Sequence, residues 1–180
     1  IRRDKKHQFE ITPIKINLNG SDINIPKYFK GYKQNSNYDI EQEIDTDISF
    51  YNEVSEVRLV NAVKTTKTVK DFKIQEQIHL KGFDVVNQQN KSGEYIPDSR
   101  NRFVFQSVDN EEDKFWIPQP RMWTDSNESS RGISHTLEEV NGELIYTKTP
   151  TEEGLKWLAD ISYNELYIDS TTYYADTSDG

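Results

Sequence analysis

Residues 156–174 read KWLADISYNELYIDSTTYY and are denser in large side chains than any other part of the chain. A short apolar turn at Trp157 and Leu158 comes directly before an aromatic-rich segment, and aromatic and β-branched residues favour strands. We expect a closing strand over Ser162–Ile168 that lies against this turn. Such a strand would bring the end of the chain into the core.

Just before this stretch, capping residues predict a short helix. Thr149 suits the N-cap, Pro150 suits the first helical position, and Glu152 occupies the reciprocal position of a capping box. The helix is expected over residues 150–159. Its buried face would consist of three large side chains, Leu155, Trp157 and Leu158.

Two Asn-Gly pairs predict tight hairpins. Asn141-Gly142 joins the two halves of a hairpin over Ile133–Thr149, and Asn19-Gly20 follows a strand over His7–Leu18. The apolar parity of that strand changes beside Pro13, which predicts a bulge or an edge position.

The clearest alternation of apolar and polar residues runs over Val69–Leu80 and predicts a half-buried antiparallel strand. Glu76 falls on its buried side. A carboxylate there should lie near a strand end, pair with a cation or mark a local bulge. His79 falls on the outer side and is expected to be solvated.

Roughly eight to ten short strands separated by turns predict an all-β fold, an antiparallel β-sandwich or jelly-roll-like domain with one short helix near the C-terminus. The 180 residues fit one domain, 1–180. Residues 149–180 would form the closing helix and strand, at the boundary to a following domain. Since the chain begins at Ile1, we expect it to be part of a longer polypeptide.

Charge and composition bear on the classes of partner. The formal net charge is −9, which disfavours nucleic acid and anionic membranes. No apolar run approaches the length of a membrane span, so no membrane insertion is predicted. There is no cysteine, which excludes disulfides and thiolate metal sites.

No catalytic residue is assigned, because the sequence contains no nucleophile elbow, phosphate-binding glycine loop or dinucleotide fingerprint. A carboxylate pair for glycoside hydrolysis stays open, since the sequence does not fix separations in space. No cofactor is predicted. Calcium is a candidate ligand for two acidic groups, Asp45 with Asp47, and Asp169 with Asp176 and Asp179.

Four aromatic side chains are candidates for binding a sugar or a partner. Tyr28 and Tyr32 lie in a segment rich in Lys and Asn, whereas Trp116 and Trp123 flank a proline-rich crossing. Each could instead anchor its loop onto the sheet.

Several of these segments together resemble a known type of module. Ile117-Pro118-Gln119-Pro120, the Asn141-Gly142 hairpin, Trp157-Leu158 with Tyr163, and Ile168-Asp169-Ser170-Thr171 are similar to the β-rich module of large secreted, cell-surface and phage-encoded proteins that ends in Trp-Leu...Tyr-Pro-Val-x-Ile-Asp-Pro-Thr. Asn164 and Ser170 replace two prolines of that pattern, and one extra residue lies between Tyr163 and Ile168.

The resemblance implies a non-enzymatic structural or assembly module of a virion or extracellular surface protein. Its partners would be other protein subunits of the same assembly. The alternative is a carbohydrate-binding module for adhesion, which would use the four aromatic side chains.

Overall fold

The computed structural model describes residues 6–25, 38–55 and 57–175. Fourteen strands and one helix lie in these ranges: β1 (Gln8–Leu18), β2 (Ser21–Ile23), β3 (Tyr38–Asp45), β4 (Ile48–Val54), β5 (Arg58–Thr65), β6 (Phe72–Lys81), β7 (Phe83–Val85), β8 (Phe103–Ser107), β9 (Lys114–Ile117), β10 (Arg121–Thr124), β11 (Ser129–Ser130), β12 (Ile133–Val140), β13 (Glu143–Pro150), α1 (Glu152–Asp160) and β14 (Leu166–Ala175).

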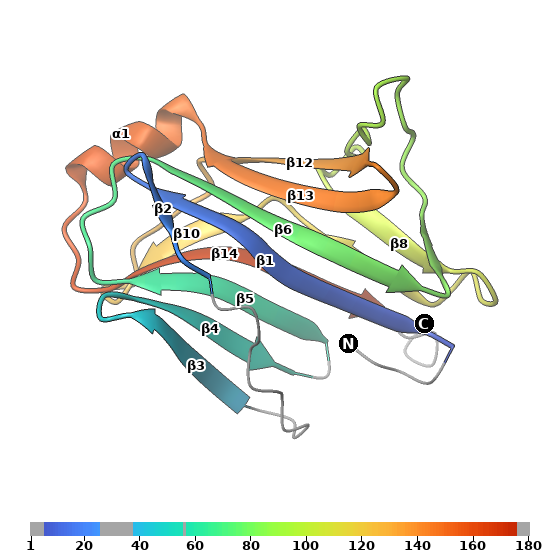
Figure 1. The fold of residues 1–180 in the computed structure, drawn as a ribbon, viewed down its shortest axis with the longest axis horizontal. Coiled ribbons are helices and arrows are strands. Elements are labelled where there is room, and N and C mark those ends of the chain that lie inside the picture. The colour runs from blue at the N-terminus through green and yellow to red at the C-terminus, as the bar shows by residue number, and fades with distance from the viewer. Residues whose placement is uncertain (1–5, 26–37, 56, 176–180) are drawn as a thin grey trace.

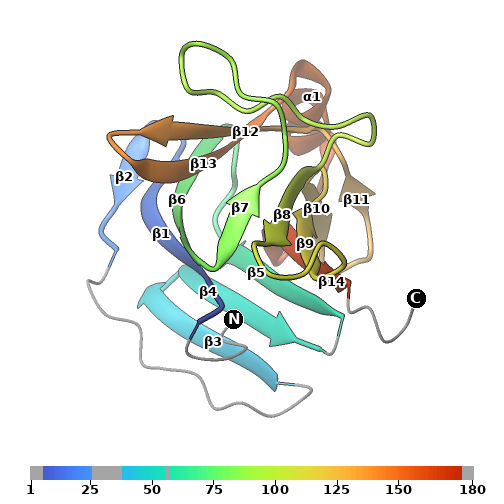
Figure 2. The ribbon, with the colours of Figure 1, turned by 90° about the vertical axis from the view of Figure 1, so that its right-hand side faces the viewer.

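Two antiparallel sheets form the fold, which confirms the predicted all-β sandwich (Figure 1, Figure 2). The first sheet has the order β12-β13-β6-β1-β2, and the second has the order β3-β4-β5-β14-β9-β8-β7. β10 and β11 also belong to the second sheet, because β10 pairs with β14 and β11 pairs with β10. We call the first the five-stranded sheet and the second the nine-stranded sheet.

Both Asn-Gly hairpins are confirmed. Asn19 and Gly20 have φ values of 55° and 82°, and Asn141 and Gly142 have 53° and 80°. Two successive positive φ values match the twist of a two-residue hairpin, and they are the reason that Asn-Gly is favoured there. The parity change in β1 is a bulge, because its register with β6 shifts between Pro13 and Lys15.

The helix begins two residues later than its capping residues predicted. Thr151 is the N-cap, and its side chain accepts a hydrogen bond from Gly154 N, whereas Thr149 and Pro150 belong to β13. Leu158 is buried and Trp157 is partly buried against the core, but Leu155 is 39% exposed, so its predicted burial is wrong.

The closing strand also begins later than predicted and runs further. Tyr163 donates its hydroxyl hydrogen to Lys67 O and accepts from Val69 N, and the Asp125 carboxylate accepts from the backbone N–H groups of Asn164 and Glu165. These contacts hold the segment before Leu166 as a loop. β14 then pairs with β5, with β10 near its start and with β9 near its end.

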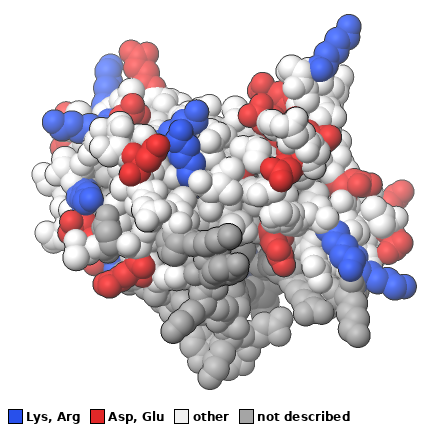
Figure 3. All heavy atoms as spheres, viewed as in Figure 1, with Lys and Arg blue, Asp and Glu red and all other residues white. Residues whose placement is uncertain are grey.

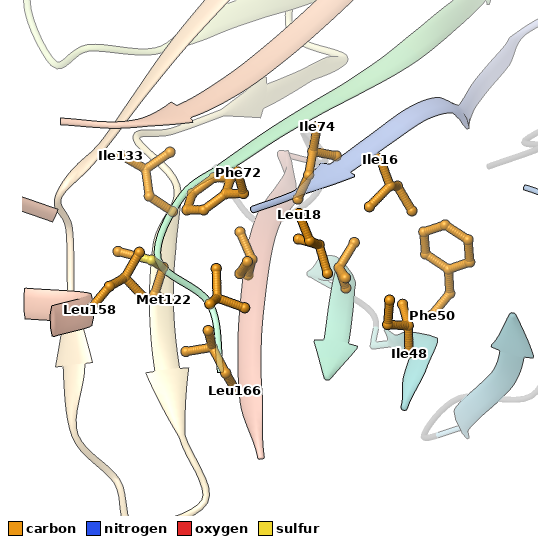
Figure 4. Packing of buried hydrophobic residues seen from close by; sticks show 13 residues of the cluster. Ile16, Leu18, Ile48, Phe50, Phe72, Ile74, Met122, Ile133, Leu158 and Leu166 are labelled. Carbon is orange, nitrogen blue, oxygen red and sulfur yellow. The ribbon is translucent and has the colours of Figure 1, made fainter. Parts of the chain in front are cut away.

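Between the sheets lie two apolar clusters. One contains Ile74 and Ile168 and extends to Leu158 of α1 (Figure 4). The other contains Ile78 and is rich in phenylalanine. Glu76 lies between Ile74 and Ile78 on the inward side of β6, so a charged group interrupts the apolar core where the two clusters meet.

Acidic and basic side chains are interspersed over the face drawn in Figure 3.

Candidate functional site

The outer face of the nine-stranded sheet collects aromatic side chains around β14. Successive side chains of a strand point to opposite faces. Leu166 and Ile168 are buried in the core between the sheets, so Tyr167, Asp169 and Tyr173 point outward from the same strand.

At one end of this row, two aromatic rings stack across neighbouring strands. Trp123 of β10 lies opposite Tyr167, with the ring centroids 5.0 Å apart and the planes 1° from parallel. The guanidinium carbon of Arg121 lies 4.7 Å from the centroid of the Trp123 ring. Tyr51 of β4 meets Tyr167 edge to face at 5.6 Å.

A second stack repeats the arrangement at the other end. Trp116 of β9 lies opposite Tyr173, with centroids 6.0 Å apart and planes at 15°. Arg102 lies over the Trp116 ring at 5.6 Å, and its Nε donates to the Asp98 carboxylate at 2.9 Å.

These side chains define one surface, which we call the aromatic face: Tyr51, Arg102, Trp116, Arg121, Trp123, Tyr167 and Tyr173. Every ring in it is half-buried.

Hydrogen bonds fix two of the tyrosine hydroxyls on this face. The Tyr167 hydroxyl donates to Glu165 at 2.8 Å, and the Tyr51 hydroxyl donates to Glu53 at 3.0 Å. The stacked rings turn their faces toward each other. A ligand would therefore meet chiefly the edges of the rings and the guanidinium groups of the neighbouring arginines.

Asp169 lies between the two stacks, and its side chain is buried. Oδ2 accepts a hydrogen bond from the Thr171 hydroxyl, whereas Oδ1 has no hydrogen-bond partner among the residues that the structure describes. Burial raises the pKa of Asp169 to about 6, against the opposing effects of Thr171, Lys148 and Arg121. A buried carboxylate oxygen without a donor is uncommon in a folded protein.

Two of the four predicted binding residues come together here. Trp116 and Trp123 lie on the same face and flank Asp169, whereas Tyr28 and Tyr32 lie outside the described residues. The sequence reasoning missed Tyr167 and Tyr173, although their spacing places them on one side of a strand.

Of the acidic residues considered for calcium, the structure describes the side chains of Asp47 and Asp169. The Asp47 carboxylate accepts hydrogen bonds from the Thr46 and Thr66 hydroxyls. Asp176 and Asp179 lie outside the described residues. Across residues 6–25, 38–55 and 57–175, no three His, Cys, Asp or Glu side chains gather closely enough to hold a metal ion.

Within the same ranges, no helix has the length and apolar character needed to cross a membrane. Comparisons with family models, with curated proteins and with solved structures find no match for this chain.

Proposed function

We propose that the domain is a non-enzymatic structural module of a virion or extracellular surface protein, and that it binds a neighbouring protein chain through the aromatic face. One observation carries the proposal: Trp, Tyr and Arg side chains gather on one side of one sheet. These three residue types are the most enriched among those that dominate the binding energy of protein interfaces.

The geometry of the aromatic face also suits binding at low entropic cost. Stacking and hydrogen bonds restrict Trp123 and Tyr167, and the contact with Asp98 restricts Arg102. Side chains that are already ordered lose less rotamer freedom when a partner binds.

The proposal is tested by placing a photo-crosslinking residue at position 123 and producing the protein in the organism from which it comes. His79 is exposed on the outer side of the five-stranded sheet and provides the control position. We expect position 123 to crosslink to a neighbouring protein chain and position 79 not to do so. Equal crosslinking from both positions, or none from position 123, would contradict the proposal.

A second candidate function is carbohydrate binding, and the pairing of Arg121 with Trp123 is the observation that favours it. Arg121 is exposed beside the half-buried Trp123 ring and could donate hydrogen bonds to sugar hydroxyl groups.

A glycan array tests this candidate. Binding by the wild type that is lost in both Trp123→Ala and Arg121→Ala, and kept in His79→Ala, would favour it over the protein-binding function. An array with no bound glycan would count against it.

A further inference from the structure

A polar cluster is buried between the sheets, on the side of β14 opposite to the aromatic face. It consists of Asn61 on β5, Glu76 on β6, Lys148 on β13 and Ser170 on β14. Glu76 is 2% exposed, Lys148 is 1% exposed and Ser170 is 1% exposed, while Asn61 is half-buried.

The two oxygens of the Glu76 carboxylate have different partners. Lys148 Nζ lies 2.8 Å from Oε1, and Asn61 Nδ2 donates to Oε2 at 3.0 Å. An amine, an amide and a carboxylate are therefore joined in one buried group. The carboxylate can exchange protons with both nitrogen atoms.

Ser170 bridges Lys148 and Glu76. Its hydroxyl accepts from Lys148 Nζ at 3.2 Å and donates to Glu76 Oε1 at 3.2 Å. Ser170 is also directly opposite Asn61 in the register of β14 and β5. Lys148 thus reaches from the five-stranded sheet to the strand pair that carries Asn61.

We propose that Lys148 and Asn61 form an intramolecular amide bond, with Glu76 as the catalytic residue that relays the proton. Glu76 accepts a proton from the Lys148 ammonium group, and the neutral Nζ attacks Asn61 Cγ. Glu76 then protonates Nδ2, the Cγ–Nδ2 bond breaks, and ammonia leaves. Nζ loses its second proton to Glu76, which passes that proton to the departing ammonia, so ammonium is released and Glu76 returns to its starting state. One C–N bond forms and one breaks, with no oxidant or other co-reactant.

The surroundings favour this reaction on physical grounds. The proton passes directly from Lys148 to Glu76, because Nζ lies 2.8 Å from Oε1. Holding reactants in place raises the rate of amide formation strongly, because the attack becomes unimolecular. A positioned acid and base supplies the proton transfers.

The bond would connect β13 of one sheet to β5 of the other. It would close a long loop in a chain that has no cysteine. A covalent link between distant positions restricts the unfolded chain, as a disulfide does. The cross-link is independent of the ligand of the aromatic face.

The mass of the intact wild-type protein under denaturing conditions tests the inference directly. We expect a mass lower than that of the sequence by one ammonia molecule, and a digest that contains the peptide of Lys148 joined to the peptide of Asn61. A mass equal to that of the sequence would overturn the proposal. Loss of one water, with Lys148 joined to Glu76, would also overturn it.

The digest must also locate the loss, because Asn-Gly pairs can lose ammonia by forming a succinimide. Such pairs occur at 19–20 and 141–142. Loss of ammonia confined to these pairs would count against the cross-link.

Variants separate the roles of the three residues. Lys148→Arg and Asn61→Asp should each show no loss of ammonia. Asn52 is the matched control, because it is the cross-strand neighbour of Asn61 on β4, and Asn52→Asp should keep the cross-link. Glu76→Gln should leave Lys148 and Asn61 unjoined, with folding checked by circular dichroism. Cross-linking in a folded Glu76→Gln protein would show that Glu76 is not the proton carrier.

Discussion

His135 and Tyr146 form a hydrogen bond inside the protein, with His135 Nδ1 2.8 Å from the Tyr146 hydroxyl oxygen. His135 Nε2 lies 3.0 Å from the Asn101 carbonyl oxygen, which can only accept. In neutral histidine one ring nitrogen donates and the other accepts. Nε2 therefore carries the hydrogen, and Tyr146 donates to Nδ1.

Protonation of His135 is expected to destabilise the fold. Burial lowers its pKa from 6.5 to about 4. Between these pH values the unfolded chain binds a proton that the folded protein does not, so stability falls as the pH drops from about 6.5 to about 4. Urea unfolding across this range should show that His135→Gln loses this part of the pH dependence. An unchanged slope would contradict the prediction.

Asp169 should act in the opposite direction. Burial raises its pKa from 3.8 to about 6, so the folded protein binds the extra proton and stability falls as the pH rises between these values. Each pKa unit corresponds to about 1.4 kcal/mol. We therefore compare the urea concentration at the unfolding midpoint of Asp169→Asn with that of the wild type. The variant should gain more over the wild type at pH 7 than at pH 4. Loss of stability at pH 7 would show that Asp169 makes a favourable ionic contact.

Gly154→Ala should destabilise the domain, although alanine favours helices by about 1 kcal/mol over glycine. A Cβ atom on Gly154 would collide with the carbonyl oxygen of Gly132, which is backbone and cannot rotate away. We expect a loss of about 1–3 kcal/mol in the free energy of unfolding. Lys156 lies on the exposed side of α1, so Lys156→Ala should change the free energy of unfolding very little. Thermal unfolding of both variants checks this.

Leu158 should contribute far more to stability than Leu155. Leu158 is 3% exposed and belongs to the core cluster, so Leu158→Ala should cost about 2–5 kcal/mol. Leu155→Ala should change the free energy of unfolding by less than about 0.5 kcal/mol, as expected for an exposed position. Similar losses in both variants would mean that the helix packs differently.

Thr151→Ala should cost about 1 kcal/mol in chemical unfolding, because it removes the acceptor for Gly154 N. Thr149 lies in β13 and does not cap α1. Thr149→Ala should therefore have the smaller effect. The reverse order would place the start of the helix at Thr149.

Local chemistry explains which features the sequence could predict. Asn141-Gly142 determines a hairpin because the two residues tolerate the positive φ values themselves. For Glu76, on the buried side of an otherwise apolar strand, the sequence left a strand end, a cationic partner and a bulge open. The structure gives it a cationic partner, Lys148, whose identity depends on the pairing of β6 with β13.

Features that depend on distant contacts were missed. The loop before β14 is held by Asp125 and by the backbone near Val69, which no local pattern reveals. The aromatic face likewise needs the register of β14 with β9 and β10. That register brings Trp116 to Tyr173 and Trp123 to Tyr167.

The position of β14 bears on the order in which the molecule can assemble during synthesis. β14 follows every other described element, yet it lies between β5 and β9 in the nine-stranded sheet. Until the ribosome has released it, β5 and β9 lack a shared neighbour, and each has an edge available for wrong pairing. Strand pairing between distant segments is also slow. The nascent chain should therefore depend on its last described strand to complete the fold, and shortening the chain within β14 should yield aggregation-prone protein.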